Sequence, residues 1–170
     1  MTDAYTAVPQ EMKDLPRWVL WKLEPNDKGK LTKTPKTLSG YNSASDNPAD
    51  WTTFDRVKHI PPTATSGIGF VFNNDGITGI DLDNAFNPDG SIYPRFREIV
   101  ETLKDTYIEI SPSGKGLHII LRCDERVYTD TETGGKNKKH KDEDGNDHGV
   151  EIYHTKHFFT VTGKRYGSSL

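Results

Sequence analysis

Short apolar segments separated by turn residues dominate this chain and predict a fold built mainly from β-strands. The segments are residues 17–23, 68–72, 76–84, 107–110, 117–122, 150–153 and 158–162. They are rich in aromatic and β-branched side chains, which favour strands. Residues 31–36 are also expected to be extended. Pro35 limits them to an edge or an irregular path, because proline cannot donate a hydrogen bond to a sheet.

Turn residues between these segments predict three β-hairpins. An Asp75-Gly76 pair, which is a strong hairpin signal, separates residues 68–72 from the segment that carries Asp81 and Asp83. A tight loop joins residues 107–110 to the returning strand at 117–122, and a short turn joins 150–153 to 158–162.

One segment has the periodicity of an amphipathic helix. It opens at Pro94, a residue favoured in the first helical turn, and continues with Phe96, Ile99, Val100 and Leu103 at the spacing of one helical face. Shorter helices are expected at residues 9–15 and at about 47–59. This order of elements predicts an α+β fold with a largely antiparallel sheet.

Residues 129–148 are polar and rich in glycine, lysine and aspartate. Such a segment buries little apolar area, so we expect a mobile loop there. Its charged run at 136–147 is expected to be solvated, with a grip on nucleic acid as the alternative. The length of 170 residues suits a single domain.

Composition narrows the classes of function. Cys123 is the only cysteine, which excludes a disulfide framework and a cysteine-rich zinc site and fits a reducing cytoplasm. The first residues lack the pattern of a signal peptide, and no apolar run is long enough to span a membrane. A net charge of −3 argues against a protein that holds nucleic acid by bulk positive charge.

Two carboxylates, Asp81 and Asp83, carry the first chemical signal. Alternate residues of a strand point to the same face, so the two like charges lie side by side and favour a cation between them. Paired carboxylates are typical ligands of Mg²⁺ or Mn²⁺. A calcium loop of the EF-hand type is excluded, because Ala85 and Phe86 stand where that pattern needs an oxygen ligand and a glycine.

The loop at residues 111–118 has the composition of a phosphate site. It offers the hydroxyls of Ser111 and Ser113, the cation of Lys115, the ring of His118 and two glycines that expose backbone N–H groups. The spacing does not match a P-loop. A plain hairpin tip with a core histidine remains the alternative.

Three further sites carry weaker signals. Glu151 alone is most simply a surface residue, unless its strand neighbours Asp81. Lys33 lies in a basic strip that either keeps a sheet edge soluble or contacts phosphate. His154 and His157 lack further ligands at zinc-site spacing, so we expect no zinc.

Taken together, the motifs resemble the archaeo-eukaryotic primase superfamily, most of all the primase-polymerase domain of phage and plasmid replication proteins. The similar segments cover nearly the whole chain. They are Trp18, Trp21, Lys33, Pro35, residues 44–51, 67–71, 80–83, 107–118, 150–153 and 158–163. Each motif is weak alone, but their joint occurrence in this order is highly specific.

The resemblance implies roles for individual residues. Asp81 and Asp83 match the paired metal ligands, and Glu151 matches the third acidic position. His118 matches the histidine that contacts the phosphates of the incoming nucleotide, with Ser111 and Ser113 in the same loop. Relatives often carry a basic residue where this chain has His157, so a phosphate or template contact there is expected to depend on pH.

The expected protein is therefore a metal-dependent DNA primase-polymerase with two Mg²⁺ or Mn²⁺ ions and no zinc module. The resemblance implies an RRM-like catalytic sheet at about 66–166, with helices on one side and an N-terminal αβ module at about 1–65. Lys33 and Lys115 are expected to help bind the triphosphate.

The expected partners are dNTP or NTP, single-stranded DNA template and primer, and a helical accessory domain and helicase in a longer protein. No membrane is involved, and the expected location is the cytoplasm, the host's for a phage protein.

Two other functions stay open from the residues. A replication initiator would bind DNA or nucleotide without polymerising it. A glycosyltransferase also uses an Asp-x-Asp pair, although the doubly wound sheet of such enzymes is not predicted here.

Overall fold

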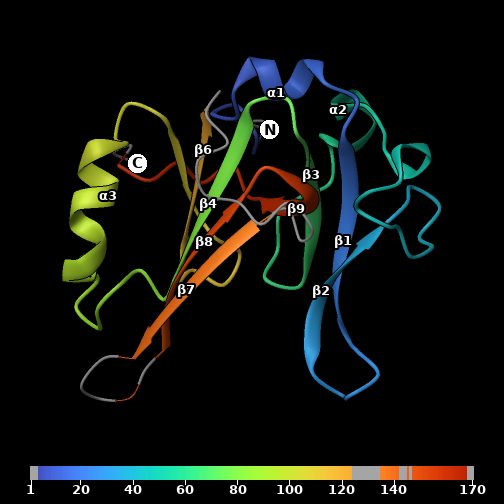
Figure 1. Cartoon of the computed structure of the whole chain (residues 1–170). Helices are drawn as coiled ribbons and strands as arrows, with labels where there is room; N and C mark the ends of the chain where they lie inside the picture. Colours follow the sequence, from blue (N-terminus) through green and yellow to red (C-terminus); the bar gives the residue numbers. More distant parts are fainter. Residues whose placement is uncertain (1–3, 124–134, 142–144, 146, 168–170) are drawn as a thin grey trace.

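The computed structural model of this chain describes residues 4–123, 135–141, 145 and 147–167, without the side chains of 135–140. Figure 1 shows two sheets that spread apart toward the lower end of the view, where the tip of the β1–β2 hairpin and the adjoining ends of β7 and β8 lie. All strand pairings are antiparallel within this part of the chain. The expected α+β class with largely antiparallel sheets is confirmed.

The smaller sheet has four strands and the larger one has five. The smaller sheet follows the order β2 (Leu31–Lys36), β1 (Trp18–Pro25), β3 (Ser66–Asn73) and β9 (Thr155–Val161). The larger sheet follows the order β5 (Tyr107–Ile110), β6 (Leu117–Arg122), β4 (Ile77–Asp83), β8 (Asp147–Tyr153) and β7 (Gly135–Lys141). Strand β1 belongs to the N-terminal module expected at about 1–65, and β3 belongs to the core expected at about 66–166. Since these two strands pair, one sheet includes strands from both.

Two of the three predicted hairpins are wrong. Strands β3 and β4 follow one another in sequence but belong to different sheets, and the same is true of β8 and β9. A strand has only two edges: β1 and β9 occupy those of β3, while β6 and β8 occupy those of β4. The β3–β4 and β8–β9 connections therefore each lead from one sheet to the other. They lie side by side, as shown by the 2.8 Å hydrogen bond that the backbone N–H of Asn74 donates to the carbonyl of His154.

Two local predictions hold. Strands β5 and β6 form the expected hairpin, with Ile110 opposite Leu117. Strand β2 forms an edge of its sheet, and Pro35 lies there opposite Trp21. A proline is tolerated in this place because an edge strand has one side without a ladder.

The helices are short. They are α1 (Gln10–Asp14), the 3₁₀ turn η1 (Pro48–Asp50), α2 (Phe54–Val57), the 3₁₀ turn η2 (Pro94–Phe96) and α3 (Arg97–Thr102). The helix predicted after Pro94 is confirmed by η2 and α3. Its apolar residues Ile99, Val100 and Leu103 pack against the buried Leu82 and neighbouring side chains of the five-stranded sheet. No helix in the described ranges is long and apolar enough to cross a membrane.

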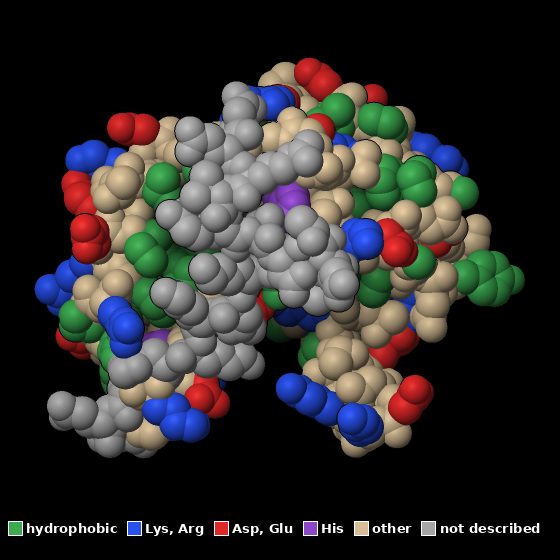
Figure 2. Space-filling view, viewed as in Figure 1, with side chains coloured by type: hydrophobic (Ala, Val, Ile, Leu, Met, Phe, Trp, Pro, Cys, Tyr) green, Lys and Arg blue, Asp and Glu red, His purple; other side chains and the backbone are tan. Residues whose placement is uncertain are grey.

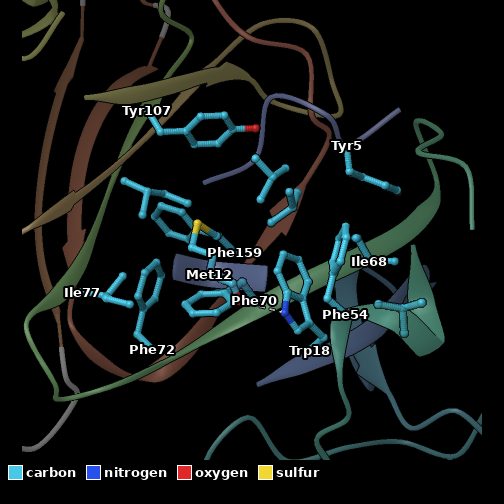
Figure 3. Packing of buried hydrophobic residues seen from close by; sticks show 14 residues of the cluster. Tyr5, Met12, Trp18, Phe54, Ile68, Phe70, Phe72, Ile77, Tyr107 and Phe159 are labelled. Atoms are coloured by element: carbon cyan, nitrogen blue, oxygen red, sulfur yellow. Dashed lines mark hydrogen bonds between the residues drawn. The ribbon is translucent and has the colours of Figure 1, made fainter. Parts of the chain in front are cut away.

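Aromatic rings fill the space between the two sheets (Figure 3). The rings of Trp18 and Phe70 lie 5.3 Å apart, and those of Phe72 and Phe159 lie 4.9 Å apart, both in edge-to-face geometry. Gly79 permits this packing, because a Cβ there would lie 2.4 Å from the ring of Phe72. The sheets therefore meet closely around Gly79, and the same face of β4 continues from this core toward Asp81 and Asp83.

The loop expected at 129–148 is partly wrong. Residues Gly135–Lys141 form strand β7, which pairs with β8 along seven positions. Backbone pairing of strands needs no apolar side chains, and lysines are common on sheet edges. Residues 129–134, 142–144 and 146 lie outside the described residues.

Candidate active site

A row of four polar side chains crosses the five-stranded sheet. Asp81 on β4 is paired directly with His118 on β6 and with Glu151 on β8, and His118 is paired with Glu109 on β5. Directly opposite residues of neighbouring strands project from the same face. The spatial arrangement expected of Asp81, His118 and Glu151, on adjacent strands and on one face, is therefore present.

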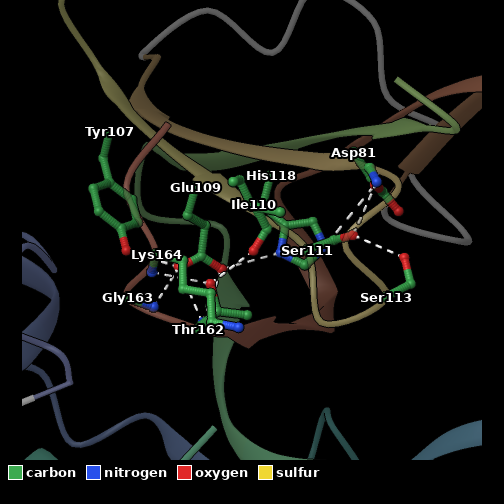
Figure 4. Close-up of polar contacts among 11 residues, drawn as sticks. Asp81, Tyr107, Glu109, Ile110, Ser111, Ser113, His118, Thr162, Gly163 and Lys164 are labelled. Carbon is green, nitrogen blue, oxygen red and sulfur yellow. Dashed lines mark hydrogen bonds and ion pairs between the residues drawn. The ribbon is translucent and has the colours of Figure 1, made fainter. Parts of the chain in front are cut away.

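The row lies at the edge of the aromatic core. His118 is only 2% exposed, and its ring stacks on Phe159 with centroids 4.8 Å apart. Its Nε2 lies 3.9 Å from Oδ1 of Asp81, and its Nδ1 lies 3.2 Å from Oε1 of Glu109. His118 is thus more than a core histidine, because both ring nitrogens face carboxylates (Figure 4).

Asp81 is electrostatically strained. Burial raises the pKa of its carboxyl, and the nearby charges of Asp83 and Glu151 raise it further, while His118 and Lys33 act in the opposite direction. The side chain still keeps 29% exposure. A partly buried carboxylate with two like charges beside it gains most from an added cation.

Lys33 reaches this row from the other sheet. It lies on β2, yet its charge lowers the pKa of both Asp81 and His157. Figure 2 shows an open gap beside the projecting β1–β2 hairpin, and Lys and Arg side chains lie along the hairpin side of this gap. The charge of Lys33, on the smaller sheet, thus acts on the acidic row of the larger sheet.

The other two carboxylates are held less tightly. Asp83 is exposed at the end of β4, where one of its oxygens accepts from the N–H of Asn84 at 3.1 Å. Glu151 is half-buried and accepts from the hydroxyl of Tyr153 at 2.7 Å. Burial and the contact with Glu151 raise the pKa of Tyr153, which keeps that hydroxyl a donor.

These three carboxylates match the preference of Mg²⁺ and Mn²⁺ for oxygen ligands. In the described ranges, however, no three Asp, Glu, His or Cys side chains converge closely enough to hold an ion. Glu151 is turned toward Tyr153 instead. The donor set therefore fits a divalent ion chemically, although its side chains are not gathered around one point.

The loop between β5 and β6 is closed by its own hydrogen bonds. Ser111 lies 3.1 Å from Ser113, hydroxyl to hydroxyl, and accepts the N–H of Gly116 at 3.1 Å. The N–H of Gly114 donates to the carbonyl of Ser111, and that of Lys115 to the hydroxyl of Ser113. The prediction that the glycines expose free N–H groups to phosphate is wrong, because the loop needs those donors to hold its shape.

The loop nevertheless lies beside the carboxylates. A Cβ at Gly116 would lie 2.8 Å from the carbonyl of Leu82 and 3.7 Å from Cα of Asp83, so only glycine permits this approach. Ser113 is exposed next to this point, whereas Ser111 is buried. Lys115 is exposed and borders a hollow of about 780 Å³ with Asn84, Phe86 and His148, whose lining does not include Asp81 or His118.

No protein-family model matches the chain. Over 152 residues the chain is 28% identical to a protein named DNA Primase-polymerase from Nitratiruptor phage NrS-1. The chain is similar to a phage primase-polymerase. The match covers 87% of the chain but 19% of the phage protein, so this chain spans about a fifth of the length of its relative. The resemblance predicted from the motifs is confirmed.

Glu109 is the member of the row that was not predicted from the sequence. It is 0% exposed, yet four groups surround its carboxylate: the backbone N–H groups of Thr162 and Gly163, the hydroxyl of Tyr107 and the ring of His118. The N–H of Thr162 lies close to both oxygens. The available signal was a glutamate within the otherwise apolar strand 107–110, directly before the serine loop. Its partners could not be read locally, because Thr162 lies 53 residues further along the chain.

The expectation for His157 needs correction. Burial lowers its pKa to about 4, and the charges of His118 and Lys33 contribute. Its ring stacks on that of Tyr153, with centroids 3.7 Å apart. His157 is therefore neutral near pH 7, so it does not supply the partly charged contact expected there.

Proposed function

We propose that this chain is the catalytic domain of a metal-dependent DNA primase-polymerase, which transfers a nucleotide from dNTP or NTP to a 3′-hydroxyl under the direction of a template. The observation that supports it best is the row in which Asp81 lies between His118 and Glu151 on adjacent strands. The similarity to a protein named DNA Primase-polymerase supports the same reaction class.

Asp81, Asp83 and Glu151 are the residues that would hold Mg²⁺ or Mn²⁺. A divalent ion in such a site neutralises phosphate charge and lowers the pKa of an attacking hydroxyl. The carboxylates would supply the negative charge that holds the ion, and His118 would supply its Nε2, which points toward Asp81. Tyr153 fixes the resting position of Glu151 through its 2.7 Å hydrogen bond.

The triphosphate would lie between His118, the exposed hydroxyl of Ser113 and the ammonium group of Lys33. Lys33 already faces the acidic row and is exposed. Ser111 supports this surface from inside the loop, because its hydroxyl is buried and holds Gly116. Lys115 borders the cavity of about 780 Å³ beside Asn84 and His148, so its charge would act on the triphosphate at longer range. Catalysis of this kind depends mainly on positioning and charge stabilisation.

The open gap beside the β1–β2 hairpin is the place proposed for the single-stranded template and primer (Figure 2). The net charge of −3 makes a local, metal-assisted grip more suitable than bulk attraction. In a longer protein, a helical accessory domain and a helicase would complete initiation and unwinding, in the cytoplasm of the host cell.

Primer extension with labelled dNTP and Mn²⁺ tests this function. The unaltered chain is expected to extend the primer, and D81N is expected to lose extension while keeping its circular dichroism spectrum. D55N is the matched control, since Asp55 is an exposed carboxylate on α2 whose ion pair with Lys58 contributes little. Undiminished extension by D81N would contradict the proposal.

A replication initiator without polymerase activity is the alternative. It would bind labelled dNTP or primed DNA but extend nothing with either Mg²⁺ or Mn²⁺. Measuring nucleotide binding in the same samples separates the two functions.

A further inference from the structure

The carboxylate of Glu109 is surrounded by donors on every side that the structure describes. One oxygen lies 3.1 Å from the N–H of Thr162, and the other lies 2.9 Å from the N–H of Gly163 and 2.7 Å from the hydroxyl of Tyr107. Burial and the neighbouring carboxylate raise the pKa of Tyr107, so its hydroxyl stays a donor. A carboxylate without a proton is the form that satisfies all of these donors.

This environment determines what His118 does with its nearer nitrogen. An acceptor-only carboxylate requires a proton on the atom that approaches it, and Nδ1 of His118 lies 3.2 Å from Oε1 of Glu109. The proton therefore sits on Nδ1. Nε2 is the nitrogen left to face Asp81, at 3.9 Å.

We propose that Glu109 is a positioning residue that holds Nδ1–H of His118 and thereby aims Nε2 at Asp81 and at the phosphates of the bound nucleotide. This inference rests on the proposed function for the substrate, but the hydrogen bond itself does not. A carboxylate behind a functional histidine commonly fixes the orientation of the ring and its tautomer.

Glu109 also connects the two sheets, which is the competing explanation for its burial. It lies on β5, while Thr162 and Gly163 directly follow β9. Two backbone donors would be enough for a purely structural link. A structural link alone would not need the additional contact with His118, which lies directly opposite Glu109 on the neighbouring strand.

Glu109→Gln is the variant that separates the two roles. Its amide oxygen can still accept the backbone N–H groups, whereas its NH₂ group requires Nδ1 of His118 to accept. The proton of the ring then moves to Nε2. Thr162→Val is the matched structural control, because it removes the 2.7 Å hydrogen bond from this hydroxyl to Ile110 at the same junction and leaves Glu109 intact.

The first readout is ¹⁵N NMR of the histidine rings, assigned with His118→Ala. We expect Nδ1–H for His118 in the unaltered chain and in Thr162→Val, and Nε2–H in Glu109→Gln. The same tautomer in all three would overturn the proposal. This measurement needs no catalysis, so it decides the role of Glu109 even for a chain that extends no primer, a result that would contradict only the proposed function.

The second readout is a double-mutant cycle in primer extension. Glu109→Gln is expected to lower kcat/KM for dNTP by about 10- to 100-fold, as partners behind functional ligands commonly do. In a His118→Ala background it should cause no further loss, because the residue through which it acts is gone. Equal losses in both backgrounds would show that Glu109 acts only on the structure.

Discussion

Asp81 and Glu151 lie directly opposite one another on β4 and β8, on the same face of the five-stranded sheet. Two carboxylates in this relationship repel each other, and partial burial adds to the cost. The fold tolerates the pair, with His118 and Lys33 compensating in part. A cation held between the two carboxylates, as proposed, would offset this cost.

Replacing Asp81 with asparagine should therefore stabilise the metal-free domain. The folded pKa lies above 3.8, so ionisation of Asp81 costs stability as pH rises past that value. D81N is expected to have a higher Tm than the unaltered chain at neutral pH, and the difference should vanish as pH falls below the unfolded pKa. Thermal unfolding with EDTA measures this effect.

The same variant tests the metal ligands without catalysis. Adding MnCl₂ should raise the Tm of the unaltered chain, because an ion that binds the folded state stabilises it. D81N should respond much less. An equal response of both proteins would place the ion elsewhere.

His118→Ala should impair nucleotide use more than DNA binding. Loss of a hydrogen bond to a charged group costs about 1.5–3 kcal/mol, or roughly 10- to 150-fold in kcat/KM. A higher KM for dNTP is expected in steady-state extension, with unchanged affinity for primed template in fluorescence anisotropy. An unchanged nucleotide titration would show that the phosphates bind elsewhere.

Tyr153 should weaken metal binding in the resting domain, since its hydroxyl holds Glu151. Tyr153→Phe removes this hydrogen bond and keeps an aromatic ring to stack on His157. We expect Mn²⁺ to bind up to about tenfold more tightly, the equivalent of roughly 1.4 kcal/mol. Titration calorimetry measures the change, with Glu151→Gln as the opposing control, and weaker binding by Tyr153→Phe would contradict this role.

The sequence predicted what depends on local patterns. The helix after Pro94 follows from side-chain spacing, and the common face of Asp81 and Asp83 follows from strand alternation. The Asp75-Gly76 signal was misleading, because a turn signal marks a change of direction but not the sheet that receives the next strand. In the folded chain β4 packs around Gly79 against Phe72 and Phe159, and Phe159 comes from a distant segment that a local signal does not include.

The same limit explains why Glu109 and β7 were missed. The partners of Glu109 at Thr162 and Gly163 come together only after both sheets have formed. Strand β7 is held by backbone pairing with β8, which leaves no pattern of apolar side chains to detect. Both features depend on hydrogen bonds between segments, which the periodicity of side chains along one segment does not reveal.

His157 should make the domain less stable at mildly acidic pH. Its pKa in the folded domain is about 4, below the ordinary value of 6.5, so keeping His157 neutral costs stability progressively as pH falls from 6.5 toward 4. Linkage gives a loss of about 2 kcal/mol between roughly pH 7.5 and pH 5. His157→Phe keeps a ring against Tyr153 and removes the titrating group. Urea unfolding at both pH values should show a smaller loss for this variant, whereas an equal loss in both proteins would assign the acid sensitivity to other groups.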